Sequence, residues 1–258
     1  MVRNLGQYSW IPFYSTYAQQ PPNHRKKLFN DEILPVLSEE DIQNNLAKEF
    51  SRTRGSLSSM ILLRDDISSL LSSKADNEIK VDNAKKAKLK LFDKVIQQWL
   101  GSIFSLDNLE LKRITFDSSS GIVLEKVARG ESVHRVRSLS ELKRRLHDGK
   151  RCFGLFHPSL PDEPLVFIHV ALTTEISKTL ASLDQTKTEY RPTHAIFYSV
   201  NSPLTGLRGL DIASLLIKEV ASTLPHHFRS IQTFSTLSPI PKFMTWLEAQ
   251  GKQVLYFV

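Results

Sequence analysis

The order of elements expected between residues 194 and 234 constrains the fold more than any other part of the chain. Residues 194–200 form an apolar run typical of a strand, and the loop 201–209 that follows contains two glycines. Apolar residues then recur at intervals of three and four up to Pro225, which predicts a helix that ends there. A second strand is expected at 231–234. A strand, a helix and another strand in this order predict an α/β or α+β domain with a mostly contiguous sheet.

A long helical segment precedes this part of the chain. Ser38 and Asp41 have the spacing of a capping box, and apolar residues recur at helical spacing as far as residue 106. In the longest stretch, 85–103, the opposite face carries five lysines. An apolar stripe of this kind is first of all a core or subunit-contact face. Residues 38–106 are therefore expected to form a helical scaffold.

The apolar pattern changes near residue 109 from helical spacing to short runs rich in β-branched residues. Residues 111–116 and 122–127 are separated by a polar stretch that ends in glycine, which is typical of a hairpin or a pair of strands. We therefore expect a domain boundary near residue 108. The α+β organisation comprises a flexible or targeting N-terminus (1–37), a helical domain (38–108) and a mixed α/β domain (109–258).

Further elements are expected around a proline-rich turn at 157–164. Apolar runs lie on both sides of this turn, and shorter amphipathic or polar stretches follow them. Their patterns predict strands at 152–156, 165–172 and 254–258, helices at 174–183 and 242–250, and a flexible loop at 184–192.

The net charge of +7 is concentrated in one basic run, which overlaps a short helix expected at 139–148. Three interpretations of this run are open. They are a solvated helix face, a surface that attracts a small polyanion such as a coenzyme phosphate, and a nucleic-acid surface. No zinc-finger spacing or aromatic RNA-binding signature accompanies it, so we do not expect a nucleic-acid partner. Its members are Arg135, Arg137, Lys143, Arg144, Arg145, Lys150 and Arg151.

Composition excludes several other classes of protein. No apolar run approaches the roughly 20 residues that a bilayer-spanning helix needs, so no membrane association is expected. The single cysteine, Cys152, excludes an intramolecular disulfide, although a bond between subunits stays open. The histidines lack metal-ligand spacing, so no metal site is expected. His169 lies in an apolar strand and is expected to be a satisfied core or inter-strand histidine.

The first 30 residues bear on the cellular compartment. They contain no Asp or Glu but carry four basic residues and many hydroxyl groups. Starts of this kind occur in mitochondrial transit peptides, which favours the mitochondrial matrix over the cytoplasm or the peroxisome. The final residues, Tyr256, Phe257 and Val258, do not form a peroxisomal address of the Ser-Lys-Leu kind.

A hydroxyl group is expected at the end of the strand 231–234. Pro239 and Pro241 remove backbone donors and end regular structure, while Pro239 holds Ser238 in an extended conformation. Ser238 is therefore either a functional serine or an ordinary turn residue. A serine-hydrolase site is excluded because no G-x-S-x-G sequence occurs.

The glycine-bearing loop that opens the helix before this strand, 205–214, is a second candidate site. Free N–H groups and the positive end of a helix dipole suit a phosphate. Neither a Walker nor a dinucleotide fingerprint occurs, so an ordinary turn between strand and helix is the alternative. Asp211, expected in the first helical turn, can complement the dipole or order a nearby donor.

Three stretches together resemble the malonyl-CoA decarboxylase family. They are Phe156–Thr173, the pair Ala195–Ser199 and Gly206–Asp211, and Ser235–Pro241. A looser similarity extends back through 113–116 to about residue 45. The resemblance implies a helical oligomerisation domain, giving a dimer or tetramer, joined to a catalytic domain of the GNAT type. It also implies conversion of malonyl-CoA to acetyl-CoA and CO2 in fatty acid metabolism without metal, biotin or another cofactor.

The resemblance also assigns the site. The serine of the S-P-I-P motif falls on Ser238, which would hold the leaving carboxylate or the thioester oxygen while an enolate forms. Asp211, Ala213 and Ser214 replace the Glu, Gly and Thr that are usual in the family, and the shorter Asp211 can loosen a contact. The residues implied in malonyl-CoA binding are Arg208, Gly209, Leu210, Asp211, Ile212, Ala213, Ser214 and Ser238.

One family feature is not found. A histidine well beyond the S-P-I-P motif is the expected proton donor. Only 17 residues follow Pro241, and none of the eight histidines matches that position. We therefore expect a truncated form with little or no decarboxylase activity. The alternative is a catalytically impaired acyl-CoA-binding or oligomerising protein.

Overall fold

The computed structural model describes residues 17–45, 57–72, 81–147, 149–177, 179, 182–183, 191–238 and 242–249. Its strands are β1 (Glu110–Ile114), β2 (Lys150–Phe156), β3 (Val166–Thr173), β4 (His194–Asn201) and β5 (Thr233–Thr236). Its α-helices are α2 (Pro22–Leu28), α4 (Leu57–Leu71), α5 (Asn83–Ile103), α6 (Gly121–Gly130), α7 (Leu139–Leu146), α9 (Ile212–His227) and α10 (Phe243–Ala249). Short helical turns are η1 (Phe29–Ile33), η2 (Leu34–Val36), η3 (Asp41–Asn45), η4 (Leu106–Asn108) and η5 (Thr205–Leu207).

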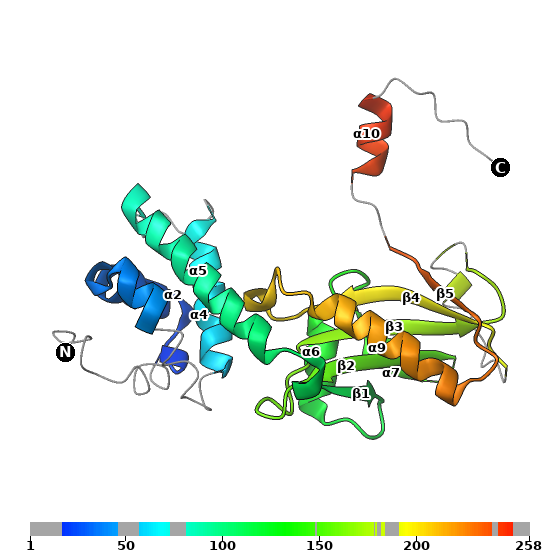
Figure 1. Cartoon of the computed structure of the whole chain (residues 1–258). Coiled ribbons are helices and arrows are strands. Elements are labelled where there is room, and N and C mark those ends of the chain that lie inside the picture. Colours follow the sequence, from blue (N-terminus) through cyan, green and yellow to red (C-terminus); the bar gives the residue numbers. More distant parts are fainter. Residues whose placement is uncertain are drawn as a thin grey trace.

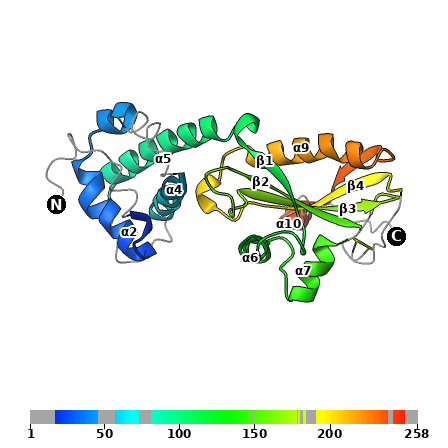
Figure 2. The same ribbon diagram turned by 90° about the horizontal axis from the view of Figure 1, so that it is seen from below.

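The five strands form one sheet in the order β1-β2-β3-β4-β5. The first four are antiparallel to their neighbours, whereas β4 and β5 are parallel and are joined by the crossover helix α9. Helix α9 covers one face of the sheet, and α6 and α7 cover the other (Figure 2). Because both faces are covered, every residue of β3 is buried. The predicted α+β class and the strands 152–156, 165–172 and 194–200 are confirmed.

The helical part of the chain lies beside the sheet, at the end where the loop before α9 is found (Figure 1). Helices α4 and α5 confirm the apolar spacing seen in the sequence, and Phe92 and Ile96 of α5 are fully buried. The capping contact is also confirmed, because the N–H of Asp41 donates to Ser38 Oγ at 3.0 Å. One continuous apolar cluster contains residues of α4, α5, α9 and the sheet.

The described part of the expected N-terminal segment 1–37 is folded. Tyr17 is buried, and its hydroxyl donates to Asp66 Oδ2 at 2.8 Å. Arg25 of α2 donates to the same carboxylate oxygen at 2.8 Å. A flexible segment is therefore the wrong prediction for residues 17–37, whose apolar side chains pack against α4 and α5. Residues 1–16 lie outside the described part of the chain.

The predicted hairpin at 111–127 is wrong in its second half. Residues 122–127 belong to α6, which begins after Ser120, whose Oγ accepts a hydrogen bond from the N–H of Val123 at 3.3 Å. Val123 and Val127, four residues apart, are both buried against the sheet. Burial of one helical face thus overrides the strand preference of β-branched residues.

Two predicted boundaries near α9 and β5 also differ. The helix continues past Pro225 to His227, because proline has a helical φ and the buried Leu224 holds the last turn against the core. The second strand begins at Thr233 rather than Ile231, since the N–H of Ile231 bonds to Phe228 within a turn.

The helix predicted at 174–183 does not begin where expected. Residues 174 and 175 form bends, and side-chain hydroxyls bind their carbonyls: Thr193 donates to Thr174 at 3.0 Å and Thr173 to Glu175 at 2.6 Å. These bonds satisfy the carbonyl groups outside a helix. The helices predicted at 139–148 and 242–250 are confirmed as α7 and α10. Residues 184–190 of the loop expected at 184–192, and the strand expected at 254–258, lie outside the described residues.

Two features are absent from the described part of the chain. No helix there is both long and apolar enough to cross a membrane. The same part of the chain contains no group of three or more His, Cys, Asp or Glu side chains that could hold a metal ion.

Candidate functional site

The loop that opens α9 follows the C-terminal end of β4. Arg208 is exposed, and Gly209 has φ +79°, a left-handed conformation that glycine adopts without strain. Asp211 immediately precedes the helix rather than lying in its first turn, and its side chain makes no capping hydrogen bond. The first N–H groups of a helix have no partner within it, so those of Ile212 and its neighbours can bind an anion.

The helical part of the chain holds the start of this loop. Arg64 of α4 donates to the carbonyl oxygen of Gly206 at 2.7 Å and forms an ion pair with Asp93 of α5 at 2.8 Å. The backbone of Gly206 lies so close to α4 that an added Cβ would be 2.0 Å from the carbonyl oxygen of Ile61. Residues far apart in sequence thus fix the position of the loop.

Two further bonds hold the rest of the loop. Gln97 of α5 donates to the carbonyl oxygen of Gly209 at 3.0 Å. The hydroxyl of Thr205 donates to the carboxylate of Asp65 in α4. The shape of the candidate coenzyme loop therefore depends on α4 and α5 as well as on its own glycines.

Ser238 lies two residues beyond β5 and is exposed. The N–H of Leu237 donates to the carbonyl oxygen of Phe197 at 2.9 Å, which extends the pairing with β4 by one residue. The side chain of Leu237 packs against a small apolar cluster that includes Leu183 and Tyr198. The serine is therefore carried by backbone that β4 positions. The prolines that follow lie outside the described residues.

A cavity of about 630 Å³ lies on the face of the sheet that α6 and α7 cover. Its walls come from the segment between α6 and α7, from α7, and from β4. Four of the seven residues of the basic run lie in these walls, and three of these four, Arg135, Arg137 and Arg144, are exposed. The run therefore faces both the cavity and the solvent. The lining residues are Val133, His134, Arg135, Arg137, Glu141, Arg144, Arg145, Leu183 and Tyr198.

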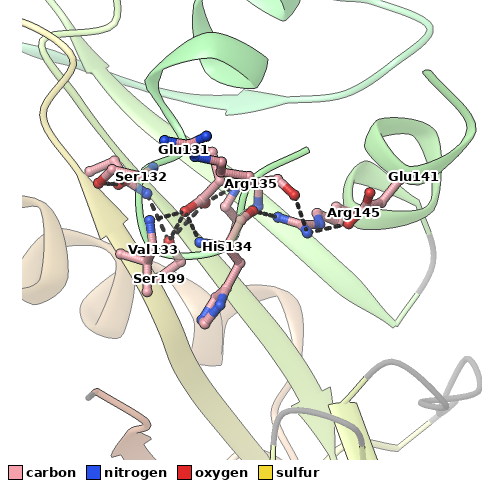
Figure 3. Close-up of polar contacts among 10 residues, drawn as sticks. Glu131, Ser132, Val133, His134, Arg135, Glu141, Arg145 and Ser199 are labelled. Carbon is pink, nitrogen blue, oxygen red and sulfur yellow. Dashed lines mark hydrogen bonds and ion pairs between the residues drawn. The ribbon is translucent and has the colours of Figure 1, made fainter. Parts of the chain in front are cut away.

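Arg145 lies in the wall of this cavity, and Figure 3 shows its polar contacts. It is 8% exposed, and it donates to the backbone carbonyls of His134 and Arg135 and to the carboxylate of Glu141. The N–H of Arg137 donates to Glu141 at 2.9 Å, and this bond, supported by Arg145, lowers the pKa of the Glu141 carboxyl. The Arg145–Glu141 pair therefore fixes the wall.

A buried glutamate anchors the same segment to β4. Glu131 is 2% exposed, and its Oε1 accepts hydrogen bonds from the N–H groups of Val133 at 2.9 Å and His134 at 2.8 Å. The hydroxyl of Ser199 in β4 donates to its Oε2 at 2.8 Å and itself accepts from Asn201 at 2.7 Å. No sequence motif marks Glu131, and we did not identify it or the cavity from the sequence.

His169 lies next to this glutamate in the core. The ring is fully buried, stacks on Tyr198 with centroids 5.8 Å apart, and has Nε2 3.4 Å from Glu131 Oε2. Neither ring nitrogen has a hydrogen-bond partner among the described residues. The predicted core position of His169 is therefore confirmed, but the prediction that its ring nitrogens are hydrogen-bonded is not. Cys152 is buried too, and burial raises the pKa of its thiol, which makes it unreactive.

Acid should destabilise the protein through His169. Burial lowers the pKa of His169 to about 4 from an ordinary 6.5, against the opposing effect of Glu131. Between these values the unfolded chain binds a proton that the folded chain does not, so stability is full above pH 6.5 and falls towards pH 4. The loss is on the order of 3 kcal/mol.

Urea unfolding of the wild type and of His169→Gln across this pH range measures the effect. The difference in unfolding free energy between the two proteins should shrink as the pH falls, because only the wild type loses the contribution of a neutral His169. The contributions of the other titrating groups are the same in both proteins and cancel. Parallel pH profiles would show that His169 is not held neutral.

Comparison with known proteins identifies relatives of this chain. The family model described as the malonyl-CoA decarboxylase C-terminal domain matches residues 107–255. Mitochondrial malonyl-CoA decarboxylase of Anser anser anser is 36% identical over 208 residues, covering 78% of this chain and 40% of the goose protein. The rat enzyme of the same name is 37% identical over 169 residues, covering 62% of this chain and 34% of its own length. The chain thus spans less than half the length of these curated relatives.

Solved structures give the same result. The crystal structure of malonyl-CoA decarboxylase from Rhodopseudomonas palustris is 30% identical with a TM-score of 0.63, covering 80% of this chain and 45% of its own. The corresponding structure from Cupriavidus metallidurans is 26% identical with a TM-score of 0.71, covering 92% of this chain and 58% of its own. Because the family match extends over more than half of the sequence and includes the loop, the cavity and Ser238, the chain belongs to the malonyl-CoA decarboxylase family.

Proposed function

We propose that this chain binds malonyl-CoA and that its site converts malonyl-CoA to acetyl-CoA and CO2, at a low rate because none of its eight histidines matches the proton donor of the family. The observation that carries the proposal is the arrangement around β4. The loop before α9 follows the C-terminal end of β4, Leu237 pairs with β4 just before Ser238, and Tyr198 of β4 lines the cavity. In mixed α/β sheets, ligands bind beyond the C-terminal ends of parallel strands, which is where β4 and β5 present the loop and Ser238.

Each part of the site has a proposed role. The segment Arg208–Ser214 would bind the coenzyme phosphates, through the charge of Arg208 and the N–H groups that open α9. Ser238 would hold the leaving carboxylate or the thioester oxygen in the reactive geometry, where its hydroxyl stabilises the enolate. The side chain of Asp211 makes no capping hydrogen bond, so it would orient the ligand or a nearby hydrogen-bond donor.

The domain organisation, the assembly and the compartment belong to the same proposal. The family match begins at residue 107, which supports a boundary near residue 108 between a helical part and a GNAT-like catalytic part. We assign the helices 38–108 to the formation of a homo-oligomer, a dimer or a tetramer. The relatives from goose, rat and mouse are named as mitochondrial, and with the acid-poor N-terminus this supports the mitochondrial matrix.

An assay of acetyl-CoA formation from malonyl-CoA tests the reaction. Ser238→Ala should lower the rate about 100-fold or more, the usual effect of removing one group that stabilises developing charge. Ser222→Ala, on the exposed side of α9, removes a hydroxyl outside the site and should leave the rate unchanged. An equal rate in the wild type and Ser238→Ala would remove Ser238 from the reaction.

A non-catalytic acyl-CoA-binding protein is the second candidate. Ser238 has no hydrogen-bond partner among the residues that the structure describes, so no acid or base is seen to act on it. This candidate predicts that malonyl-CoA raises the melting temperature without forming acetyl-CoA. If neither malonyl-CoA nor acetyl-CoA raises the melting temperature, both candidate functions are wrong.

A further inference from the structure

We infer that the cavity between α7 and β4 is the binding site for the free carboxylate of the malonyl group, and that Arg144 and Arg137 provide the charge. The inference rests on the proposed function, because it names where the substrate's acid end lies. The cavity is lined by four arginines and one glutamate.

Most of the positive charge in this cavity has no ion-pair partner among the described residues. Arg145 is committed to Glu141 and to backbone carbonyls, but the side chains of Arg135, Arg137 and Arg144 form no ion pair or hydrogen bond with another described residue. Like charges collected in a concave wall focus the local field and attract anions. Three guanidinium groups are therefore available to a ligand.

The walls are held in place before any ligand arrives. Glu131 fixes the N–H groups of Val133 and His134, and Arg145 fixes the carbonyls of His134 and Arg135 (Figure 3). The segment that carries Arg135 and leads to Arg137 is thus bonded from both sides. A pre-organised wall binds a ligand with a smaller loss of conformational freedom.

The position of the cavity connects it to the reacting end of the substrate. Leu183 and Tyr198 line the cavity and also belong to the apolar cluster against which Leu237 packs, one residue before Ser238. An acyl-CoA with its phosphates at the start of α9 and its thioester at Ser238 would direct its acyl end towards this cavity.

The chemistry of the lining fits a short acid better than a bare inorganic anion. Val133, Leu183 and Tyr198 give the cavity apolar surface that can contact a methylene group and the pantetheine arm. A guanidinium fork binds a carboxylate through two parallel hydrogen bonds. Acetyl-CoA lacks this carboxylate, so the cavity should distinguish the substrate from the product.

Calorimetric titration of malonyl-CoA and acetyl-CoA into the full chain tests the inference. The wild type should bind malonyl-CoA more tightly. Arg144→Gln should weaken malonyl-CoA binding about 10-fold to 100-fold, as loss of one charge-assisted contact does, and leave acetyl-CoA binding within 2-fold. The matched control is Arg129→Gln on α6, which removes the same charge from an exposed arginine outside the cavity and should change neither affinity.

Several outcomes would overturn the inference without touching the proposed function. One is equal affinity of the wild type for malonyl-CoA and acetyl-CoA. Another is an Arg144→Gln variant whose affinity for both thioesters falls by the same factor. Inorganic phosphate that competes with malonyl-CoA as well as free malonate does would show a general anion site instead.

If the wild type binds neither ester, the proposed function fails and titration of free malonate decides the inference. Saturable malonate binding that Arg144→Gln weakens supports a carboxylate site, and no malonate binding overturns it.

Discussion

Gly206→Ala is expected to lower the unfolding free energy by about 3 kcal/mol or more, at the upper end of the effects of overpacking. The added Cβ would lie 2.0 Å from the carbonyl oxygen and 2.9 Å from the carbonyl carbon of Ile61 in α4. Backbone of a buried helix cannot yield as a flexible side chain can, so α4 and the loop must separate. The separation would also break the bond from Arg64 to the carbonyl oxygen of Gly206. Urea denaturation measures the effect as a fall in the midpoint.

Gly121→Ala is the matched control for this substitution. Gly121 is the first residue of α6, and nothing lies within 4 Å of a Cβ added there. Alanine at that position should be neutral or stabilising by about 0.5–1 kcal/mol, because it restricts the unfolded chain. A Gly206→Ala protein as stable as Gly121→Ala would contradict the close packing of the loop on α4.

Glu131→Ala is expected to destabilise the protein by about 3 kcal/mol. The substitution removes the acceptor of two backbone N–H groups and of the Ser199 hydroxyl, and each buried group left unpaired costs about 1–3 kcal/mol. It also frees the segment that carries Arg135, so the preference for malonyl-CoA over acetyl-CoA should fall as well.

Glu125→Ala in α6, the helix that ends just before Glu131, is the control. Glu125 is exposed and pairs with Arg129 across one helical turn, so its loss should change stability by about 0.5 kcal/mol or less. Glu131→Gln keeps the size of the side chain and one acceptor oxygen, and should lie between the wild type and Glu131→Ala. Equal stability of the Glu131→Ala and Glu125→Ala proteins would contradict a structural role for the buried carboxylate.

The sequence predicts those elements whose buried residues form a regular apolar pattern within a short stretch of the chain. The apolar stripes of α4 and α5, the apolar runs of β2, β3 and β4, and the loop before α9 are examples. It does not predict α6, because residues 122–127 are rich in the β-branched residues that are typical of strands. Only the packing of Val123 and Val127 on the sheet selects the helix. The end of α9 likewise depends on how Leu224 packs.

The candidate site divides in the same way. The loop and Ser238 follow from glycine and proline chemistry and from the family resemblance. The cavity brings together Val133, Arg144, Leu183 and Tyr198, from segments up to 65 positions apart, so no local window contains it. The one available signal was the basic run, which only Glu141 and Asp148 interrupt. Glu131 carries no signal because its partners are mainly backbone groups and a strand serine.

Hydrogen exchange of backbone amides, with and without ligand, tests the central claim most directly. Bound malonyl-CoA is predicted to slow exchange at 209–214, at 133–137 and at Leu237 and Ser238, since these segments surround the proposed ligand. Acetyl-CoA is predicted to protect the first and last of these segments but not 133–137. Protection confined to other parts of the chain, or none with either ester, would contradict an acyl-CoA site built around β4.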